Sequence, residues 1–195
     1  ALRTGNPGKE DTHPLHGELP YANFDHPRLL FGEDEKGFYL AITGEFQYND
    51  AFTSSYYRAY PIVKIHSQSS LLDIIIQIDN LSEYPMEHMY MTHINFRPID
   101  YGKMIQPVSW SPEFIKLRES TPAHSKDIPL SEEYIQFVNT IKTNPERMQT
   151  ILPEDPYFPE LVIYLKSPKT DDQGWTHFLQ VHPNGSGDYV SYRPD

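Results

Sequence analysis

Four successive strand-like runs between positions 37 and 96, the first three of which alternate apolar and polar residues, restrict the fold of this chain more than any other feature. Side chains two apart on a strand share a face, so such alternation predicts half-buried strands. Only short turn-forming segments separate the runs, and no helical pattern intervenes. We therefore expect antiparallel strands in a meander or a sandwich. The four predicted strands are Gly37 to Tyr48, Ser55 to His66, Leu71 to Asn80 and Met86 to Phe96.

The second half of the chain has a different pattern, with a proline-rich excursion and then a helix. The helix is predicted over Glu132 to Lys142, because Ser131 is a suitable N-cap and two glutamates occupy the first turn. Asn184-Gly185 is a hairpin signal between the last two strands. The later predicted strands are Lys103 to Val108, Glu160 to Lys166, Trp175 to His182 and Gly187 to Arg193. We expect one mainly β domain over residues 1–195, with a short helical excursion around residues 131–150.

Composition excludes several classes of partner. The formal net charge is −11, and an acidic chain lacks the basic footprint that nucleic acids and anionic membranes require. The sequence has no cysteine and no apolar span of about 18 residues, which argues against disulfides, thiolate sites and membrane-spanning helices. Its 14 tyrosines and 10 phenylalanines favour pleated sheets and clefts for polar ligands such as carbohydrates. We expect a cytoplasmic protein that binds neither nucleic acid nor membrane.

The stretch Met86 to Pro98 places His93 and Asn95 two residues apart in an otherwise apolar run. Neither face of such a strand is plainly polar, so we predict a central strand that carries a polar pair on a buried or cleft-lining surface. Buried imidazole and amide groups need hydrogen-bond partners, which either the protein or a ligand supplies. His16, in a compact segment between turns, is the natural candidate to meet His93.

Three groups of residues could form a catalytic or metal site. Two imidazoles in one pocket, from His16 and His93, can act as acid and hydrogen-bond donor near neutral pH. A metal site could use His13, His16 and Glu18 with His88 or His93, but the spacing matches no known signature, and exposed loop histidines are the simpler interpretation. A carboxylate pair for glycoside hydrolysis would need two facing acids.

The acidic residues do not suggest such a pair. Asp73 and Asp79 share a strand face but lie six residues apart, which is typical of a solvated face. The charged turn from Glu33 to Lys36 receives no role. Trp110 and Trp175 could stack on a sugar ring, although tryptophan more often packs in a core or at its rim.

Two segments carry a family resemblance. They are PLHGELPYA, from Pro14 to Ala22, and DNLSEYPMEHMYMTHINFRP, from Asp79 to Pro98. In this order the chain resembles the galactose-mutarotase-like superfamily, and within it the aldose 1-epimerase-like branch known as domain of unknown function 4432. The resemblance covers most of residues 2–108 and the remainder only loosely. One departure is Thr92, which stands where the branch has a tyrosine before the histidine.

The resemblance implies an antiparallel β-supersandwich that interconverts the anomers of a monosaccharide or modified monosaccharide, without a metal or cofactor. It makes His93 the acid that protonates the ring oxygen, and His16 a hydrogen-bonding partner of the sugar. Asn95, Glu18 and Arg97 become candidate substrate-binding residues. The general base of the family is a glutamate on a strand beyond any counterpart of Asp195, so we expect this sequence to be an internal piece of a longer protein or an unusually trimmed member, and to lack that base.

Two alternatives stay open at this point. One is a noncatalytic carbohydrate-binding module that uses the same cleft. The other is a metal-assisted sugar lyase or isomerase that uses His13, His16 and Glu18.

Overall fold

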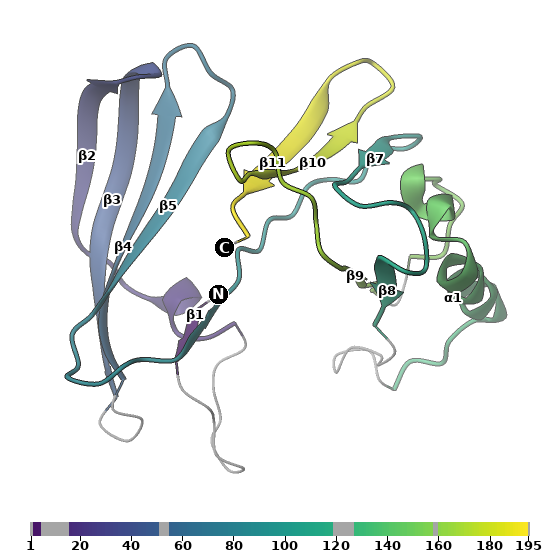
Figure 1. Ribbon diagram of the computed structural model, residues 1–195, viewed down its shortest axis with the longest axis horizontal. Helices are drawn as coiled ribbons and strands as arrows, with labels where there is room; N and C mark the ends of the chain where they lie inside the picture. The colour runs from purple at the N-terminus through teal and green to yellow at the C-terminus, as the bar shows by residue number, and fades with distance from the viewer. Residues whose placement is uncertain (1, 5–15, 51–54, 119–126, 158–159, 195) are drawn as a thin grey trace. The chain divides into compact units, whose positions relative to one another are not determined.

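The computed structural model describes residues 2–4, 16–50, 55–118, 127–157 and 160–194, and it divides the chain into two compact units. Unit 1 is Ala1–Ile94 and unit 2 is Asn95–Asp195 (Figure 1). Unit 1 contains β1 (Leu2–Thr4), η1 (Leu19–Tyr21), β2 (Asp25–Asp34), β3 (Gly37–Asp50), β4 (Ser55–His66), β5 (Leu72–Asn80) and β6 (His88–Tyr90). Unit 2 contains β7 (Lys103–Ile105), β8 (Ile115–Leu117), α1 (Glu132–Thr143), η3 (Pro145–Gln149), β9 (Ile163–Leu165), β10 (Thr176–Val181) and β11 (Gly187–Tyr192). The expectation of a single domain over residues 1–195 stays a prediction.

The main element of unit 1 is a four-stranded antiparallel sheet in the order β2-β3-β4-β5 (Figure 1). Its three later strands coincide with the predicted strands to within two residues at each end. The predicted mainly β class, with antiparallel pairing and a short helix, is therefore confirmed. Pro61 lies in the central strand β4, not at an edge, and the register with β3 passes from Thr43↔Ile62 directly to Phe46↔Ala59. Proline has no N–H to donate, so the ladder is interrupted there.

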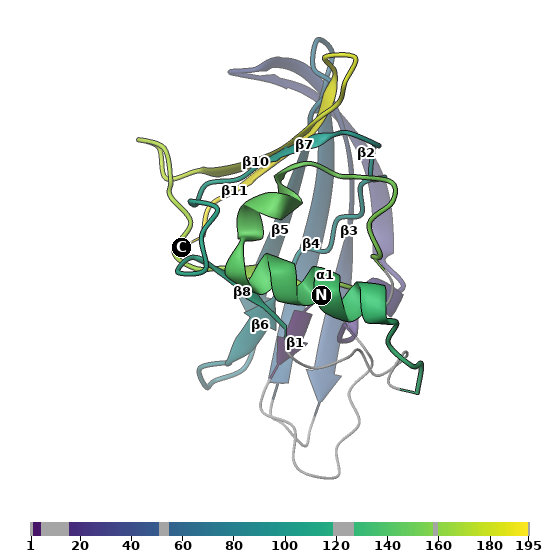
Figure 2. The same cartoon turned by 90° about the vertical axis from the view of Figure 1, so that its right-hand side faces the viewer.

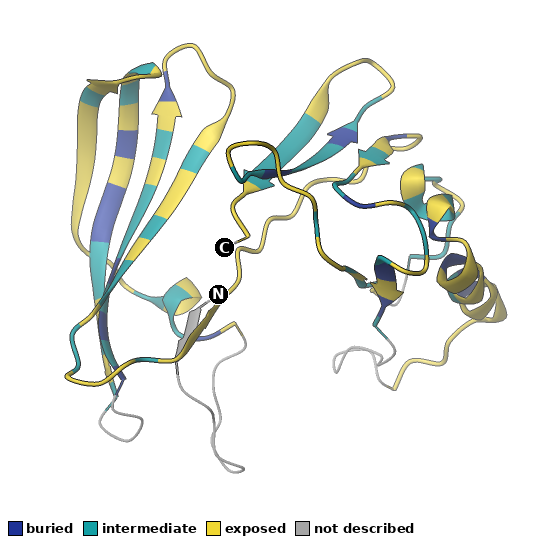
Figure 3. Cartoon of the chain, viewed as in Figure 1, coloured by how far each residue is buried: buried dark blue, intermediate teal, exposed yellow. Residues whose placement is uncertain are grey.

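The core of unit 1 lies between the strands β3, β4 and β5 and the short helix η1. Tyr57 and Ala59 of β4 are fully buried (Figure 3). Half-buried apolar side chains surround them, from Leu19, Phe46, Tyr48, Ile78 and Met86. The aromatic rings of Phe46 and Tyr57 meet edge to face, with centroids 6.3 Å apart, which is a favoured geometry for aromatic pairs.

Sequence reasoning missed strand β2. Its first residues include Pro27, and the register with β3 shifts between Asp25 and Arg28. Proline and a bulge are tolerated because β2 is an edge strand of this sheet. The charged residues at its end were interpreted as part of a turn, although they continue the ladder as far as Asp34.

The predicted strand from Met86 to Phe96 is wrong in length and in burial. Only His88–Tyr90 is a strand, paired with β1, and residues 91–99 have no regular structure. Residues 87–98 are all exposed (Figure 3), so the expected central, buried strand is absent from this part of the chain. Alternation alone does not make a strand, because the backbone also needs a neighbouring strand to complete its hydrogen bonds.

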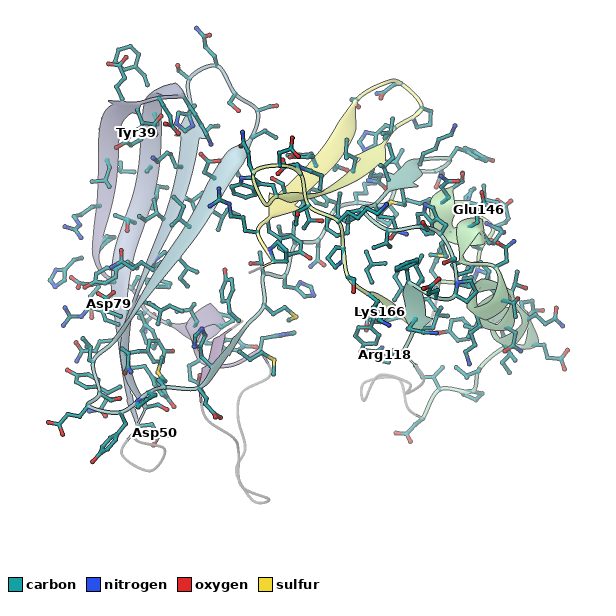
Figure 4. All side chains as sticks on the ribbon, viewed as in Figure 1. Tyr39, Asp50, Asp79, Arg118, Glu146 and Lys166 are labelled. Atoms are coloured by element: carbon teal, nitrogen blue, oxygen red, sulfur yellow. The ribbon has the colours of Figure 1, made fainter. Side chains whose placement is uncertain are left out.

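A charge network lies near the β2–β3 hairpin end of the four-stranded sheet, where Tyr39 is labelled in Figure 4. His66 is 5% exposed, with Nε2 2.9 Å from Asp34 Oδ1 and Nδ1 3.8 Å from Asp73 Oδ2. Lys64 Nζ donates to Asp34 Oδ2 at 3.0 Å, and Lys36 Nζ donates to Asp73 at 2.9 Å. Asp73 is therefore a half-buried ion-pair partner, not part of a solvated face, and the charged turn has a structural role.

Unit 2 holds its own core around the helix. The Ser131 hydroxyl accepts a hydrogen bond from the N–H of Tyr134 at 3.1 Å, which confirms the predicted N-cap. Phe137 and Ile141 of α1 pack on Leu117 of β8. Figure 2 shows the course of α1 and η3 in this unit. Sequence reasoning missed β8, which is only three residues long and pairs with β9. A second sheet has the antiparallel order β11-β10-β7, and its hairpin contains Asn184-Gly185, as predicted.

The pKa of Asp34 provides a pH test of the charge network. The hydrogen bond from Lys64 and then the backbone N–H of Lys36 lower the pKa of Asp34 from 3.8 to about 2. A lowered folded-state pKa stabilises the fold above the unfolded value, and this stabilisation disappears as the pH falls from 3.8 toward 2. We expect Asp34→Asn to flatten the fall in unfolding free energy over that range, measured by urea unfolding at a series of pH values.

The Lys64→Met variant is the matched control, because it removes the main donor while Asp34 stays titratable. We expect it to shift the acid-induced fall to higher pH. An unchanged pH dependence in Asp34→Asn would show that this carboxylate does not stabilise the fold.

Two isoleucines of α1 offer a matched test of the core of unit 2. Ile141 is 0% exposed and Ile135 is 44% exposed. Truncating a buried isoleucine typically costs about 2–5 kcal/mol, whereas exposed substitutions stay within about 0.5 kcal/mol. We expect Ile141→Ala to lower the unfolding free energy of unit 2 within the first range, and Ile135→Ala to leave it nearly unchanged. Amide hydrogen exchange of α1 provides the measurement, and equal effects would contradict the assigned core.

Candidate functional site

His16 and His93, which belong to segments far apart in the sequence, lie side by side in unit 1. Their ring centroids are 5.6 Å apart with an interplanar angle of 55°, and both residues are exposed. Two imidazoles at this separation can both contact one small ligand. Their position in the structure agrees with the expected pairing, while their catalytic roles stay a prediction.

The backbone at His16 is left-handed, with φ of 71°, and the next residue, Gly17, has φ of 73°. A non-glycine residue in this region costs of order 1–3 kcal/mol and is found mainly at tight turns and functional sites. Gly17 adopts the conformation without a Cβ clash and is buried, so the chain turns sharply there. The turn presents the His16 imidazole to solvent beside His93.

Further hydroxyl and imidazole groups lie just before His93, and sequence reasoning did not place them in a pocket. Thr92 Oγ1 donates to the Tyr90 hydroxyl at 3.1 Å. His88 and Tyr90 share one face of β6 and line a pocket of about 360 Å³. The remaining lining residues are Ile76, Ile78, Asn80 and Met86. The two-residue spacing of these lining residues along β5 and β6 can be read from the sequence. The sequence does not show that the two strands line the same pocket.

The environment of Glu18 differs from that of an exposed residue that contacts a sugar. It is half-buried at the N-terminus of η1, and its Oε2 atom is enclosed. Burial, followed by the charge of Glu18, raises the pKa of both Tyr48 and Tyr57. The carboxylate therefore lies near these two tyrosines and links the His16 turn to the core of the sheet.

The other predicted substrate contacts, Asn95 and Arg97, belong to unit 2. Both are exposed and lie in the irregular segment of residues 91–99. The buried Gln180 fixes this segment, because its Nε2 donates to the Arg97 carbonyl at 3.0 Å and its Oε1 accepts from the Ile99 N–H at 3.1 Å. Sequence reasoning missed this anchor, since a single glutamine in a strand gives no signal of a distant partner.

The metal and carboxylate-pair interpretations gain no geometric support. Within the part of the chain that the structure describes, no group of three or more histidine, aspartate or glutamate side chains could hold a metal ion. His13 lies outside the described residues. Asp73 pairs with Lys36, whereas Asp79 accepts a hydrogen bond from Gln77 at 2.9 Å, so each carboxylate has its own partner.

Comparisons with family models, with curated proteins and with solved structures find no match to this chain. In the described residues, no helix combines the length and apolar character needed to cross a membrane. The family resemblance and its catalytic roles therefore stand as a proposal.

Two tyrosines of β4 test the packing beneath Glu18. The Tyr57 hydroxyl is buried and has no hydrogen-bond partner among the described residues, whereas the Tyr60 hydroxyl accepts from Arg58 at 3.3 Å. An unsatisfied buried hydroxyl is costly, but a hydrogen-bonded one stabilises by about 0.5–1.5 kcal/mol. We expect Tyr57→Phe to preserve or raise the unfolding free energy in urea and Tyr60→Phe to lower it. A clear loss of stability in Tyr57→Phe would reveal a partner for that hydroxyl.

Proposed function

We propose that this protein is a carbohydrate-active isomerase of the aldose 1-epimerase type, with His93 and His16 as its acid–base pair. The observation that carries the proposal is the 5.6 Å separation of the two exposed imidazole rings. The sequence resemblance supports His93 as the acid and His16 as a residue that contacts the sugar, and the assignment of His16 as the base rests on the short separation of the two rings. The substrate is a monosaccharide, free or modified, with a free anomeric hydroxyl.

The reaction needs two proton transfers at adjacent positions of the sugar. His93 donates a proton to the ring oxygen while the anomeric hydroxyl loses its proton to a base. The bond between the anomeric carbon and the ring oxygen breaks, and a carbonyl forms. Rotation and reclosure on the other face, with the protons returned, give the second anomer.

A pair of neighbouring imidazoles suits this chemistry. The ring oxygen and the anomeric oxygen are bonded to the same carbon, so the groups that act on them must lie close together. Histidine titrates near neutral pH, and one ring can donate a proton while a second, neutral ring accepts one. We assign the ring oxygen to His93 and the anomeric hydroxyl to His16.

The pocket along β5 and β6 has the character of a small sugar site. Isoleucine and methionine side chains provide apolar surface for the C–H face of a ring, and His88 and Tyr90 provide polar groups in the same lining. Asn80 contributes little, because its amide already bonds Tyr84 O and Ser82. Asn95, Glu18 and Arg97 stay predicted sugar contacts.

Anomer exchange measures this function directly. We expect saturation-transfer NMR to detect exchange between the anomers of glucose or galactose above the buffer rate, and His93→Ala to reduce it to background. Removing a general acid typically costs about 10²–10⁴-fold in rate.

The matched control is His26→Ala. His26 is an exposed histidine of the same unit, 3.6 Å from Glu45, and we expect normal exchange in this variant. Unchanged exchange in His93→Ala would overturn the assignment of the acid. Sugar binding without any exchange would instead identify a noncatalytic carbohydrate-binding protein.

A further inference from the structure

A second histidine-centred group lies in unit 2, on the β10–β11 hairpin. His177 of β10 stacks on Tyr189 of β11, with ring centroids 5.9 Å apart and an interplanar angle of 18°. The Nδ1 atom of His177 is 2.7 Å from the Tyr189 hydroxyl, and its Nε2 atom is 3.0 Å from Asp171 Oδ2. Carboxylate, imidazole and hydroxyl therefore form one continuous hydrogen-bonded relay.

The ionisation state of Asp171 determines which group donates and which accepts in each hydrogen bond of this relay. The backbone N–H of Trp175 makes the largest contribution to lowering the pKa of Asp171, and His177 and the backbone N–H of Gln173 add to it. An ionised carboxylate only accepts hydrogen bonds, so His177 must carry its proton on Nε2. In the neutral ring, Nδ1 then has a lone pair, and the Tyr189 O–H donates to it. The phenol is thus aligned to lose its proton to His177.

Two features make the relay accessible and firmly oriented. His177, Tyr189 and Asp171 all retain exposed surface. Asp171 is held by backbone N–H groups of Gln173 and Trp175, both at 2.9 Å from Oδ1, so its other oxygen is directed to the imidazole. A fixed base beside a hydroxyl is the arrangement that activates nucleophiles in acyl transfer.

The second histidine of the same hairpin shows what distinguishes this relay. His182 lies 3.0 Å from Asp188 and 3.0 Å from Ser186 Oγ. Ser186 Oγ is closer to another acceptor, the Asn184 side-chain oxygen, at 2.7 Å. The serine hydroxyl is therefore shared within the turn, whereas the tyrosine hydroxyl points to its histidine.

We propose that Tyr189 is an activated nucleophile that accepts an acyl group from an aryl ester, at a site separate from His16 and His93. Tyr189 Oη attacks the ester carbonyl carbon as its proton passes to His177 Nδ1. The phenol leaving group departs and takes that proton, which leaves an O-acyl tyrosine and a free phenol. Trp175, whose backbone N–H bonds Asp171, carries a partly exposed ring with the Arg193 guanidinium 5.1 Å from its centroid, and we assign the aryl group to this ring.

Acetylation by p-nitrophenyl acetate tests the proposal on the full chain. Release of p-nitrophenolate gives the rate, and peptide mass mapping gives the acetylated tyrosines. We expect Tyr189 to react about 100-fold or more faster than Tyr192, which is exposed on the same strand and stacks on Phe178. Tyr189→Phe should remove the fast phase.

Variants of the relay separate activation from a merely structural role. We expect His177→Gln to reduce Tyr189 acetylation to the level of Tyr192, and Asp171→Asn to reduce it partly. In His177→Gly, imidazole added to the buffer should restore the preference for Tyr189 over Tyr192, whereas acetylimidazole formed in solution would acetylate both tyrosines alike. Equal acetylation of the two tyrosines in the native chain would overturn the proposal, as would fast acetylation of Tyr189 in His177→Gln. The comparison of Tyr189 with Tyr192 needs no variant, so it decides the matter even if a substitution prevents folding.

Discussion

The double-sided pairing of β4 is the constraint on which the rest of unit 1 depends. This strand bonds to β3 on one side and to β5 on the other, so its residues cannot shift without breaking two ladders. The register fixes Tyr57 and Ala59 in the core, against Leu19 of η1. The segment that carries the His16 turn is thereby held against the sheet, and the position of the imidazole follows from strand register.

Local patterns predicted the elements whose partners are close in sequence. The strands β3, β4 and β5 alternate clearly and are joined by short turns, and α1 has a serine cap and an apolar stripe. The strand predicted at Met86 to Phe96 failed for the opposite reason. Its apolar alternation is genuine, but its described ladder partner is β1, which pairs over three residues only. Alternation shows what a strand could bury, and long-range pairing decides whether it forms.

The same distinction applies to the candidate sites. His16 and His93 were joined by a resemblance that already encodes their proximity, and the structure places their rings together. The networks of His66 and His177 escaped prediction because their partners come from other elements or from a loop. In the sequence, a histidine in a strand is an isolated polar residue. Only the strand register shows that it lies beside a carboxylate. Asp34 was therefore interpreted only as part of a charged turn without a role.

The histidine sites of His66, of His177 and of the His16–His93 pair differ in how many described partners hold the imidazole ring. This difference determines the role that each site suits. The ring of His66 is buried between two carboxylates, which suits a structural ion-pair network. The ring of His177 is partly exposed, and Asp171 fixes its tautomer, which suits the proposed acceptance of a proton from one defined hydroxyl. The rings of His16 and His93 lie 5.6 Å apart at the surface, where one small ligand can contact both. The proposed reversible ring opening of a sugar needs such shared access, because an acid and a base must exchange roles when the ring closes again.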